Sequence, residues 1–169
     1  MNFELTIIVP VYNEEDNLDR VHQEMKQFLS ISKKKAKILF VNDGSKDNSQ
    51  SLIEKICKDN EEFTFISFGK NAGLSAAIKA GFDYTDTPWV GYIDADLQTA
   101  PEDFNILMEF AGEFDLVTGV RSNRKDSFTK NMSSLIANGI RRAFTDDGMD
   151  DTGCPLKIIR TDMAKKIPM

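Results

Sequence analysis

Residues 5–16 read Leu-Thr-Ile-Ile-Val-Pro-Val-Tyr-Asn-Glu-Glu-Asp, and this stretch decides which fold class the chain fits. Residues 5–9 are apolar and rich in β-branched side chains, which predicts a buried strand that ends at Pro10. Asn13 is suited to cap a helix, and the acidic residues after it suit the positive end of a helix dipole. Apolar side chains then recur at helical spacing as far as residue 29. The stretch therefore predicts a strand followed by an amphipathic helix.

The same alternation of short apolar runs and amphipathic stretches continues along the chain. It predicts an α/β fold with a mostly parallel central sheet flanked by helices, Rossmann-like in its layers. The expected strands are residues 5–9, 37–41, 63–68, 89–93, 115–119 and 152–159. The expected helices cover residues 18–29, 48–58, 74–84, 102–110 and 128–144.

The composition fits one acidic globular domain. The chain has 169 residues, and 27 acidic against 21 basic side chains give a net charge of −6, which argues against a nucleic-acid partner. The apolar run over residues 5–11 is too short to cross a bilayer, and no signal peptide opens the chain. Cys57 and Cys154 form no CxxC pair, so we expect reduced thiols and a cytoplasmic location.

Several common binding and catalytic motifs are absent from the sequence. No GxGxxG follows the first expected strand and no GxxxxGK[ST] occurs, so dinucleotide and P-loop sites are not expected. His22 is the only histidine, and its place beside the apolar stripe of a helix favours packing over catalysis or zinc binding. Cys154 is interpreted as a small buried residue rather than a nucleophile.

Polar side chains follow the expected strands at the points where the strands end. Parallel sheets with helical crossovers bind ligands beyond the carboxyl ends of their strands. We therefore expect one edge of the sheet to collect Tyr12, Asn13, Asp43, Asn71, Asp94, Asp96 and Arg121.

Asp94-Ala95-Asp96 is the candidate for a metal site. In an extended chain the two carboxylates share a face and lie about 6–7 Å apart. A divalent cation would relieve their repulsion and bridge the phosphates of a ligand. The alternative for such a pair is a polar turn that leaves the sheet.

Asp43 and Tyr12 are candidate contacts for a nucleoside. The sequence around Asp43 is typical of a β-turn, but its carboxylate could also accept a hydrogen bond from a base imide or a ribose hydroxyl. Tyr12 is suited either to stack on a base or to cap the core. Lys70 and Arg121 are candidates to meet a diphosphate, and a solvated surface position is the alternative for both.

Taken together, these segments resemble the family 2 glycosyltransferases, which have the GT-A (nucleotide-diphospho-sugar transferase) fold. The Asp-Ala-Asp-Leu-Gln form is most similar to the branch of dolichol-phosphate mannose synthase-like and bacterial polyprenyl-phosphate glycosyltransferases. The likeness runs in family order over nearly the whole chain. The matching segments are Ile8-Val9-Pro10-Val11-Tyr12-Asn13-Glu14-Glu15, Val41-Asn42-Asp43-Gly44-Ser45, Lys70-Asn71-Ala72-Gly73-Leu74, Asp94-Ala95-Asp96-Leu97-Gln98, Gly119-Val120-Arg121 and Asp151-Thr152-Gly153-Cys154-Pro155-Leu156-Lys157.

The resemblance implies a donor-binding role for several residues. Pro10, Tyr12 and Glu14 would line a nucleoside pocket, and Asp43 would contact the base. Asp94 would lie near the ribose and the metal.

The resemblance also implies a metal and a diphosphate partner. Asp96, together with Gln98 and beside Asp94, would hold Mg²⁺ or Mn²⁺ against the diphosphate of the donor. Arg121 would lie near the phosphates, from the loop after the fifth expected strand. Metal and cation would then neutralise the charge of the leaving nucleoside diphosphate.

The reaction implied by the family is an inverting transfer of a sugar from a nucleotide-diphosphate donor to an acceptor, here a polyprenyl phosphate. A phosphate acceptor is already ionised, whereas an alcohol acceptor needs a carboxylate base, for which Asp150 and Asp151 are candidates. Two alternatives stay open. They are a saccharide acceptor in cell-surface polysaccharide synthesis and a nucleotide-sugar-binding domain without catalysis.

The C-terminus departs from the family pattern. The chain stops at Met169, just after the segment that closes the donor site in the family. We therefore expect residues 1–169 to be a single donor-binding catalytic domain, truncated at its C-terminus. Membrane contact would come only from segments absent here, at the cytoplasmic face of the membrane in the full-length protein.

Overall fold

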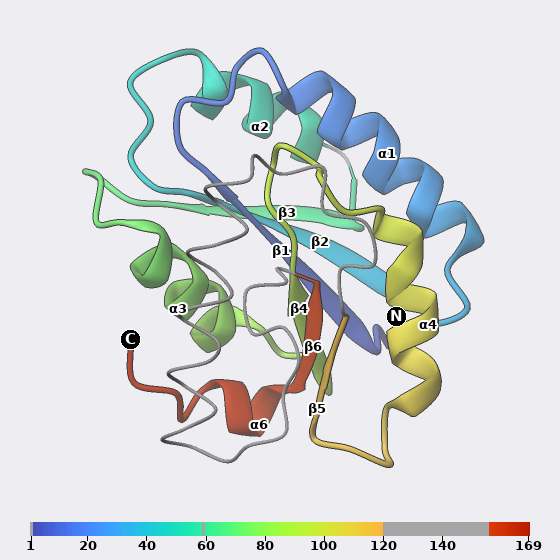
Figure 1. Cartoon of the computed structure of the whole chain (residues 1–169). Helices are drawn as coiled ribbons and strands as arrows, with labels where there is room; N and C mark the ends of the chain where they lie inside the picture. The colour runs from blue at the N-terminus through green and yellow to red at the C-terminus, as the bar shows by residue number, and fades with distance from the viewer. Residues whose placement is uncertain (1, 59, 120–155) are drawn as a thin grey trace, which may run out of the picture. The chain divides into compact units, whose positions relative to one another are not determined.

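The computed structural model describes residues 2–58, 60–119 and 156–169. The described strands form one sheet with the order β3-β2-β1-β4-β6-β5 (Figure 1). The predicted helix over residues 128–144 lies outside the described residues. The strands are β1 Leu5–Val11, β2 Ala36–Asn42, β3 Phe63–Ser67, β4 Trp89–Tyr92, β5 Leu116–Thr118 and β6 Lys157–Arg160.

Helices lie in the described connections between the first five strands, and one follows β6. Among the described helices, none is long and apolar enough to cross a membrane. The longer helices are α1 Leu18–Ile31, α2 Ser49–Cys57 and α3 Leu74–Tyr84. The shorter ones are η1 Pro101–Asp103, α4 Phe104–Leu107, η2 Met108–Phe110 and α6 Thr161–Ala164.

The chain divides into two compact units. One contains residues 1–117 and 155–169, and the other contains residues 118–154. The structure describes most of the first unit, but only Thr118 and Gly119 of the second. The single catalytic domain expected over residues 1–169 therefore stays a prediction.

The sheet is mostly parallel, as predicted. β1 pairs in parallel with β2 and with β4, and β2 pairs in parallel with β3. β6 pairs antiparallel with β4. Buried parallel strands need cover on both faces, which the helical crossovers supply. The prediction of an α/β fold with a helix-flanked central sheet is confirmed.

One face of the sheet packs against α3 and α6. Ile8 of β1 shares a buried core with Phe82 of α3 and Ala164 of α6. Gly81 allows the close approach of α3, because a Cβ there would lie 2.6 Å from Ile8 Cδ1.

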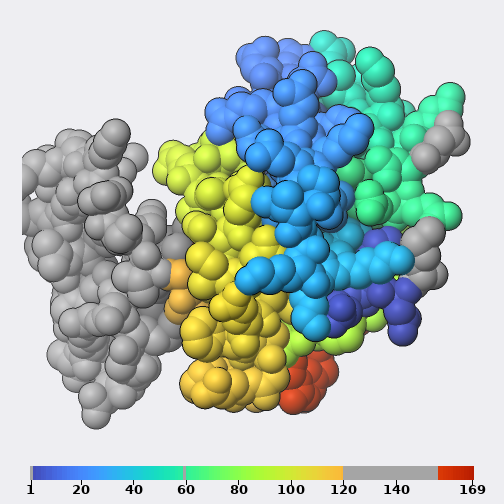
Figure 2. All heavy atoms as spheres, turned by 90° about the vertical axis from the view of Figure 1, so that its right-hand side faces the viewer, coloured from blue at the N-terminus to red at the C-terminus, as the bar shows by residue number. Residues whose placement is uncertain are grey.

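The other face packs against α1, α2 and the segment around α4 (Figure 1). The rings of Phe28 in α1 and Phe104 in α4 lie 6.0 Å apart between centroids. Figure 2 shows α1 and the α4 segment side by side, where the Lys33 N–H donates to Asn105 Oδ1 over 2.8 Å. Successive side chains of β1 point to opposite faces of the sheet, so its apolar residues contribute to the core on each face.

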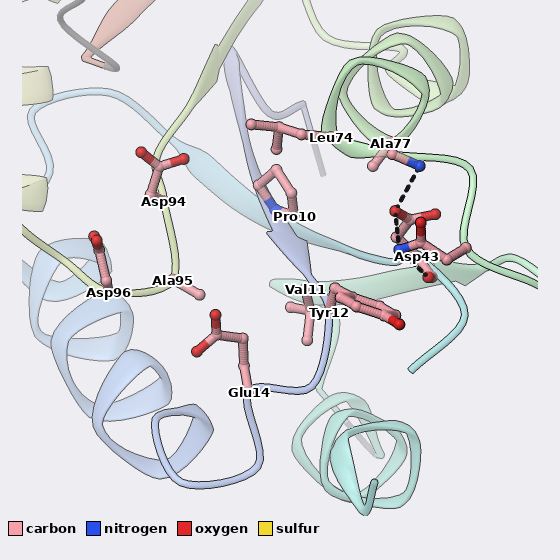
Figure 3. Close-up of a pocket in the computed structure, with 12 residues that line it drawn as sticks. Pro10, Val11, Tyr12, Glu14, Asp43, Leu74, Ala77, Asp94, Ala95 and Asp96 are labelled. Carbon is pink, nitrogen blue, oxygen red and sulfur yellow. Dashed lines mark hydrogen bonds between the residues drawn. The ribbon is translucent and has the colours of Figure 1, made fainter. Parts of the chain in front are cut away.

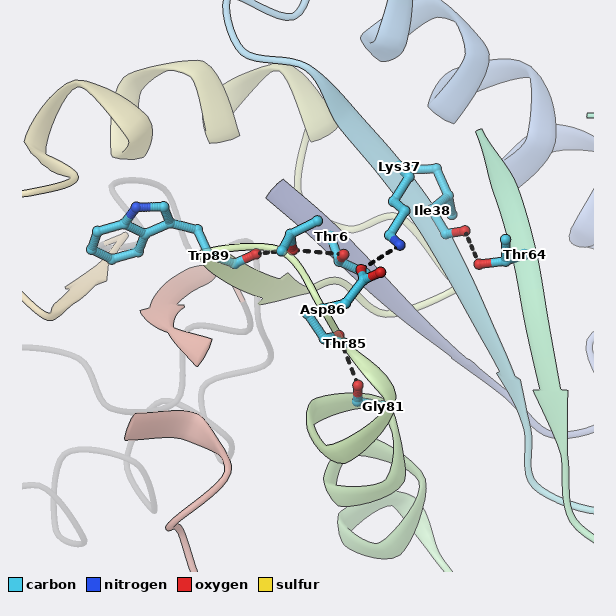
Figure 4. A network of polar contacts seen from close by, with 9 residues as sticks. Thr6, Lys37, Ile38, Thr64, Gly81, Thr85, Asp86 and Trp89 are labelled. Atoms are coloured by element: carbon cyan, nitrogen blue, oxygen red, sulfur yellow. Dashed lines mark hydrogen bonds and ion pairs between the residues drawn. The ribbon is translucent and has the colours of Figure 1, made fainter. Parts of the chain in front are cut away.

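The amino ends of the central strands are joined by a polar network (Figure 4). The hydroxyls of Thr6 and Thr87 share a buried hydrogen bond of 2.8 Å, and the Thr87 hydroxyl also donates to the Trp89 carbonyl over 2.7 Å. Lys37 Nζ pairs with Asp86 at 2.6 Å, and this hydrogen bond holds the pKa of Asp86 below its ordinary value. The network anchors the connection from α3 to β4 at the edge opposite the polar strand ends.

Two predictions about the first strand and helix were wrong. β1 continues through Pro10 to Val11. The nitrogen of Pro10 lies on the β4 side of the strand, and pairing with β4 ends before it, at Ile8 and Tyr92. The sheet therefore loses no hydrogen bond from the N–H that proline lacks. Asn13 does not cap α1, which begins at Leu18. Its backbone is left-handed, with φ +56°, and its side chain bonds to another loop instead.

Two later elements also differ from their predictions. Residues 102–110 form no single helix but are divided among η1, α4 and η2, because the segment tightens into 3-10 turns at both ends, as helix termini often do. The last strand is β6, Lys157–Arg160, rather than residues 152–159, of which residues 152–155 lie outside the described ones.

Candidate functional site

A pocket of about 420 Å³ opens at the carboxyl ends of β1, β2 and β4 (Figure 3). This strand-end pocket is the place where an α/β sheet is expected to bind a ligand. It brings together six of the predicted site residues, which are Pro10, Tyr12, Glu14, Asp43, Asp94 and Asp96. Leu74 and Ala77, from the first turn of α3, add apolar surface to it.

The Asp43 carboxylate is buried and already holds a loop. Its Oδ1 accepts the Ala72 N–H over 2.7 Å, and its Oδ2 accepts the Gly73 N–H and Asn71 Nδ2, both over 2.9 Å. Gly44 is packed against the same loop, because a Cβ there would lie 2.5 Å from the Lys70 carbonyl carbon. We call these three hydrogen bonds the Asp43 cradle. Asp43 Oδ1 accepts one of these bonds and can accept a further one, so base contact by Asp43 stays a prediction.

The loops after β1 and β2 are joined by a series of hydrogen bonds that we call the loop ladder. The Asn13 N–H donates to Ser45 Oγ over 3.0 Å, and Asn13 Oδ1 accepts the Lys46 N–H over 2.8 Å. The Glu14 N–H donates to Ser49 Oγ over 2.9 Å. These bonds fix the backbone at Asn13 and Glu14, directly after Tyr12, and Tyr12 and Glu14 both line the pocket.

The loop ladder continues through two acidic residues. The Glu15 N–H donates to Asp47 Oδ2 over 3.1 Å, and Glu15 Oε2 accepts the Asn48 N–H over 2.9 Å. Burial raises the pKa of Asp47, but the hydrogen bonds from Ser49 and Glu15 together outweigh it, so the pKa of Asp47 lies below its ordinary value. Asp47 is therefore held as a carboxylate within the ladder.

The opposite wall of the pocket is a turn over residues 94–98, which we call the acidic turn. The Leu97 N–H donates to the Asp94 carbonyl over 3.1 Å, and the Gln98 N–H donates to Asp96 Oδ1 over 3.1 Å. Leu97 has φ +50°, in the left-handed backbone region that residues other than glycine rarely adopt. Figure 3 shows the Glu14 carboxylate directed toward this turn from the β1 side.

The acidic turn is chemically suited to a hard divalent cation. Within the described residues, no group of three or more His, Cys, Asp or Glu side chains is arranged to hold a metal. Mg²⁺, however, is commonly bound by one or two carboxylates, with waters and phosphates as its other ligands. Asp94 and Asp96 line the open pocket and supply such carboxylates, so the residues fit the predicted cation.

The remaining predicted site residues are not brought into the strand-end pocket. Lys70 lines a neighbouring pocket of about 530 Å³, which shares Tyr12 and Asn71 with the first. Gln98 is exposed and meets Asp96 through its backbone N–H. Arg121, Asp150 and Asp151 lie outside the described residues.

For Tyr12, His22 and the cysteines, the sequence allowed both a structural and a functional interpretation. Tyr12 is 42% exposed, so it does not cap the core and its ring is accessible to a base. His22 packs edge-on against Phe63 with centroids 5.1 Å apart, and burial with nearby Lys26 lowers its pKa, which confirms a packing role. Cys57 is a free thiol whose pKa burial raises to about 11, whereas Cys154 is outside the described residues.

Comparison with known proteins identifies the family. Residues 6–167 match the family model described as glycosyl transferase family 2. The chain belongs to glycosyltransferase family 2. The family predicted from the motifs is thereby confirmed.

A curated relative of this family 2 domain is the undecaprenyl-phosphate 4-deoxy-4-formamido-L-arabinose transferase of Edwardsiella ictaluri (strain 93-146). The two are 31% identical over 163 residues, which are 95% of this chain and 50% of the relative. The chain thus spans about half the length of that relative. The match is consistent with the polyprenyl-phosphate branch that the acidic motif resembles.

Solved structures share the GT-A fold of this family 2 domain. Glucosyl-3-phosphoglycerate synthase from Mycobacterium tuberculosis, in complex with Mn²⁺, UDP and glucosyl-3-phosphoglycerate, superposes with a TM-score of 0.72 at 15% identity. The alignment covers 95% of this chain and 58% of that one. A mannosyltransferase from Pyrobaculum calidifontis, in complex with GDP-Man and Mn²⁺, has a TM-score of 0.67 at 16% identity, over 95% and 45% of the two chains.

Sequence reasoning missed two kinds of site residue in this family 2 domain. Leu74 was assigned to a helix and to a segment that matches the family, and Ala77 only to the helix, so neither was predicted to line the pocket. Arg20 of α1 donates to the Asp96 carbonyl over 3.0 Å, a contact between residues 76 positions apart that no local pattern signals.

Proposed function

We propose that this chain is the donor-binding catalytic part of a metal-dependent, inverting glycosyltransferase that transfers a sugar from a nucleotide-diphosphate donor to a polyprenyl phosphate. One observation carries the proposal. A single pocket joins an accessible aromatic ring, Tyr12, to a pair of carboxylates, Asp94 and Asp96, at the carboxyl edge of the sheet. A nucleoside diphosphate has the matching parts, a flat base at one end and a cation-binding diphosphate at the other.

The wall of the pocket after β1 and β2 would bind the nucleoside. Tyr12 offers a ring on which a base can stack, and Pro10 and Glu14 lie on either side of it in the sequence. The Asp43 carboxylate would accept a hydrogen bond from the base in addition to the hydrogen bonds of its cradle.

The acidic turn would bind the diphosphate through Mg²⁺ or Mn²⁺. Asp94 and Asp96 would hold the ion, with Gln98 as the further ligand predicted from the sequence. Such a bound ion supplies positive charge against the diphosphate as it leaves. Lys70 and Arg121 are proposed as its basic partners, and Mn²⁺ in two proteins of the same fold supports this choice of ion.

The acceptor would be a polyprenyl phosphate, a choice that the name of the curated relative supports. A phosphate oxygen of the acceptor forms the bond to the anomeric carbon while the bond to the donor diphosphate breaks on the opposite side, which inverts that carbon. The phosphate is already ionised and needs no base, so Asp151 would be catalytic only with an alcohol acceptor. Because the lipid chain of this acceptor lies in a bilayer, the transfer would take place at the membrane surface, on its cytoplasmic face.

Nucleotide titration tests the donor site. UDP, GDP, CDP and dTDP are each titrated with and without Mn²⁺ while the midpoint of thermal unfolding is followed. We expect one nucleotide to raise the midpoint only when Mn²⁺ is present, and Asp96→Asn to abolish the rise. No rise with any nucleotide at millimolar concentration would overturn the proposal.

Product analysis tests the acceptor. The protein is incubated with the preferred labelled nucleotide sugar and either a polyprenyl phosphate or a soluble saccharide. We expect the label to appear in the lipid fraction only with the polyprenyl phosphate. Label on the saccharide would contradict the lipid acceptor and favour a saccharide acceptor. Nucleotide binding without any transfer would indicate a binding domain without catalysis.

A further inference from the structure

The acidic turn is held in a strained conformation next to the pocket. Leu97 lies at φ +50°, which is unfavourable for a residue with a side chain. The bonds of Leu97 N–H to the Asp94 carbonyl and of Gln98 N–H to Asp96 Oδ1 both lie within the turn itself. Because both bonds join residues of the turn to each other, they do not fix the position of the acidic turn relative to the rest of the pocket.

Arg20 contacts the acidic turn from outside. Its Nη2 donates to the Asp96 carbonyl over 3.0 Å. Arg20 projects from α1, whose residues Leu18 and Val21 are fully buried on either side of it in the sequence. The helix is therefore a firm anchor, and the bond ties the backbone at Asp96 to the body of the fold.

The contact leaves the Asp96 side chain available to a ligand. Within the described residues, the Asp96 carboxylate accepts the Gln98 N–H through Oδ1 and takes part in no ion pair with Arg20. Arg20 therefore acts on the Asp96 backbone and does not neutralise its carboxylate. Fixing the carbonyl limits the rotations available to the same residue, and so limits where its carboxylate can lie.

We propose that Arg20 is a positioning residue, which holds the acidic turn so that the Asp96 carboxylate lies where it would bind the metal ion of the donor diphosphate. The proposal rests on the proposed function for the role of Asp96. It assigns to α1 a part in donor binding that neither the motifs nor the family match indicates.

Amide hydrogen exchange without nucleotide or metal tests whether Arg20 holds the turn. We expect Arg20→Ala to speed exchange at Leu97 and Gln98 about tenfold, because local opening sets these rates, while amides in β1 stay unchanged. Arg20→Lys keeps a donor and should lie in between. Lys26→Ala removes an exposed cation from the same helix and should match the wild type. Equal exchange in Arg20→Ala and Lys26→Ala would overturn the proposal.

Metal-dependent nucleotide binding tests whether Arg20 acts on the donor site. Mn²⁺-dependent affinity is measured for the nucleoside diphosphate, among UDP, GDP, CDP and dTDP, that stabilises the wild type most. We expect Arg20→Ala to weaken binding about tenfold, Arg20→Lys to weaken it less and Lys26→Ala to leave it unchanged, because a turn that is no longer held places the Asp96 carboxylate less often where it can bind the ion. An affinity of Arg20→Ala equal to that of Lys26→Ala would contradict the positioning role. A wild type that binds none of the nucleotides would refute the proposed function instead, and hydrogen exchange would still decide whether Arg20 holds the turn.

Discussion

The two walls of the strand-end pocket are built in opposite ways. The wall after β1 and β2 is cross-linked by the loop ladder and by the Asp43 cradle, and the acceptors Ser49 and Asp43 are both buried. The acidic turn is partly exposed and strained, and Arg20 ties it to α1. One wall is thus fixed by many bonds before any ligand binds, whereas the other is a single turn that carries two carboxylates.

The difference indicates a division of labour in donor binding. A preformed surface binds a rigid base with little loss of conformational entropy, so a cross-linked wall suits the nucleoside. Two neighbouring carboxylates repel each other until a cation lies between them, so the acidic turn suits the metal and the diphosphate. We infer that substitutions in the first wall act mainly on stability, and substitutions in the acidic turn mainly on metal-dependent binding.

The largest loss of stability is expected from Asp43→Ala. It removes the three bonds of the cradle and leaves the N–H groups of Ala72 and Gly73 without their carboxylate acceptor, which should lower the unfolding free energy by about 3 kcal/mol. Asp43→Asn keeps one acceptor oxygen and should lose about half as much. Urea unfolding measures both. Glu61→Gln, in an exposed carboxylate before β3, is the control, and a loss in Asp43→Ala as small as the control's would contradict the cradle.

A smaller loss is expected at Asn13, where two substitutions separate two effects. Asn13→Gly removes the bond to the Lys46 N–H but tolerates φ +56°, so it should cost about 1 kcal/mol. Asn13→Ala also places an unsuited residue in the left-handed region and should cost about 2 kcal/mol. Chemical unfolding compares the two with Asn2→Ala, an exposed control. Equal losses for Ala and Gly would show that the backbone conformation contributes nothing.

Much of this arrangement could be predicted from local sequence pattern. Apolar periodicity predicted the sheet and its helices, and the rule that parallel strands bind ligands at their carboxyl ends brought Tyr12, Asp43, Asp94 and Asp96 to one edge. These inferences succeeded because each depends on residues close together in the chain and on a general property of the fold.

The remainder depends on contacts between distant segments, which local pattern does not reveal. The local sequence suggests that Asn13 caps a helix, but its side chain accepts a hydrogen bond from the Lys46 N–H, 33 positions away. Pro10 looks like a strand end, but β4 is too short to need its N–H. Two of the three partners of the Asp43 carboxylate are backbone N–H groups, which carry no sequence signature, and Arg20 contacts a backbone carbonyl.

A pH-dependent loss is expected from Asp47, the carboxylate of the loop ladder. Its pKa is lower in the folded chain than the ordinary value of 3.8, so its carboxylate stabilises the fold above that value. This contribution should disappear as the pH falls through 3.8 and then through the lower folded pKa. Asp47→Asn should therefore be less stable than the wild type at pH 7, and the difference should shrink toward pH 3. Unfolding midpoints at the two pH values measure it, and a constant difference would exclude a charge effect.

The smallest effect on stability is expected from Asp96→Asn, which changes an exposed side chain of the acidic turn. The amide oxygen can still accept the Gln98 N–H, so the unfolding free energy should change by less than about 0.5 kcal/mol. The same substitution should abolish Mn²⁺-dependent nucleotide binding, because a neutral amide is a poorer ligand for a hard cation than a carboxylate. Chemical unfolding and nucleotide titration on one preparation measure both quantities. If Asp96→Asn destabilised the fold as much as Asn13→Ala, the acidic turn would be a structural element like the first wall, and the division of labour between the walls would fail.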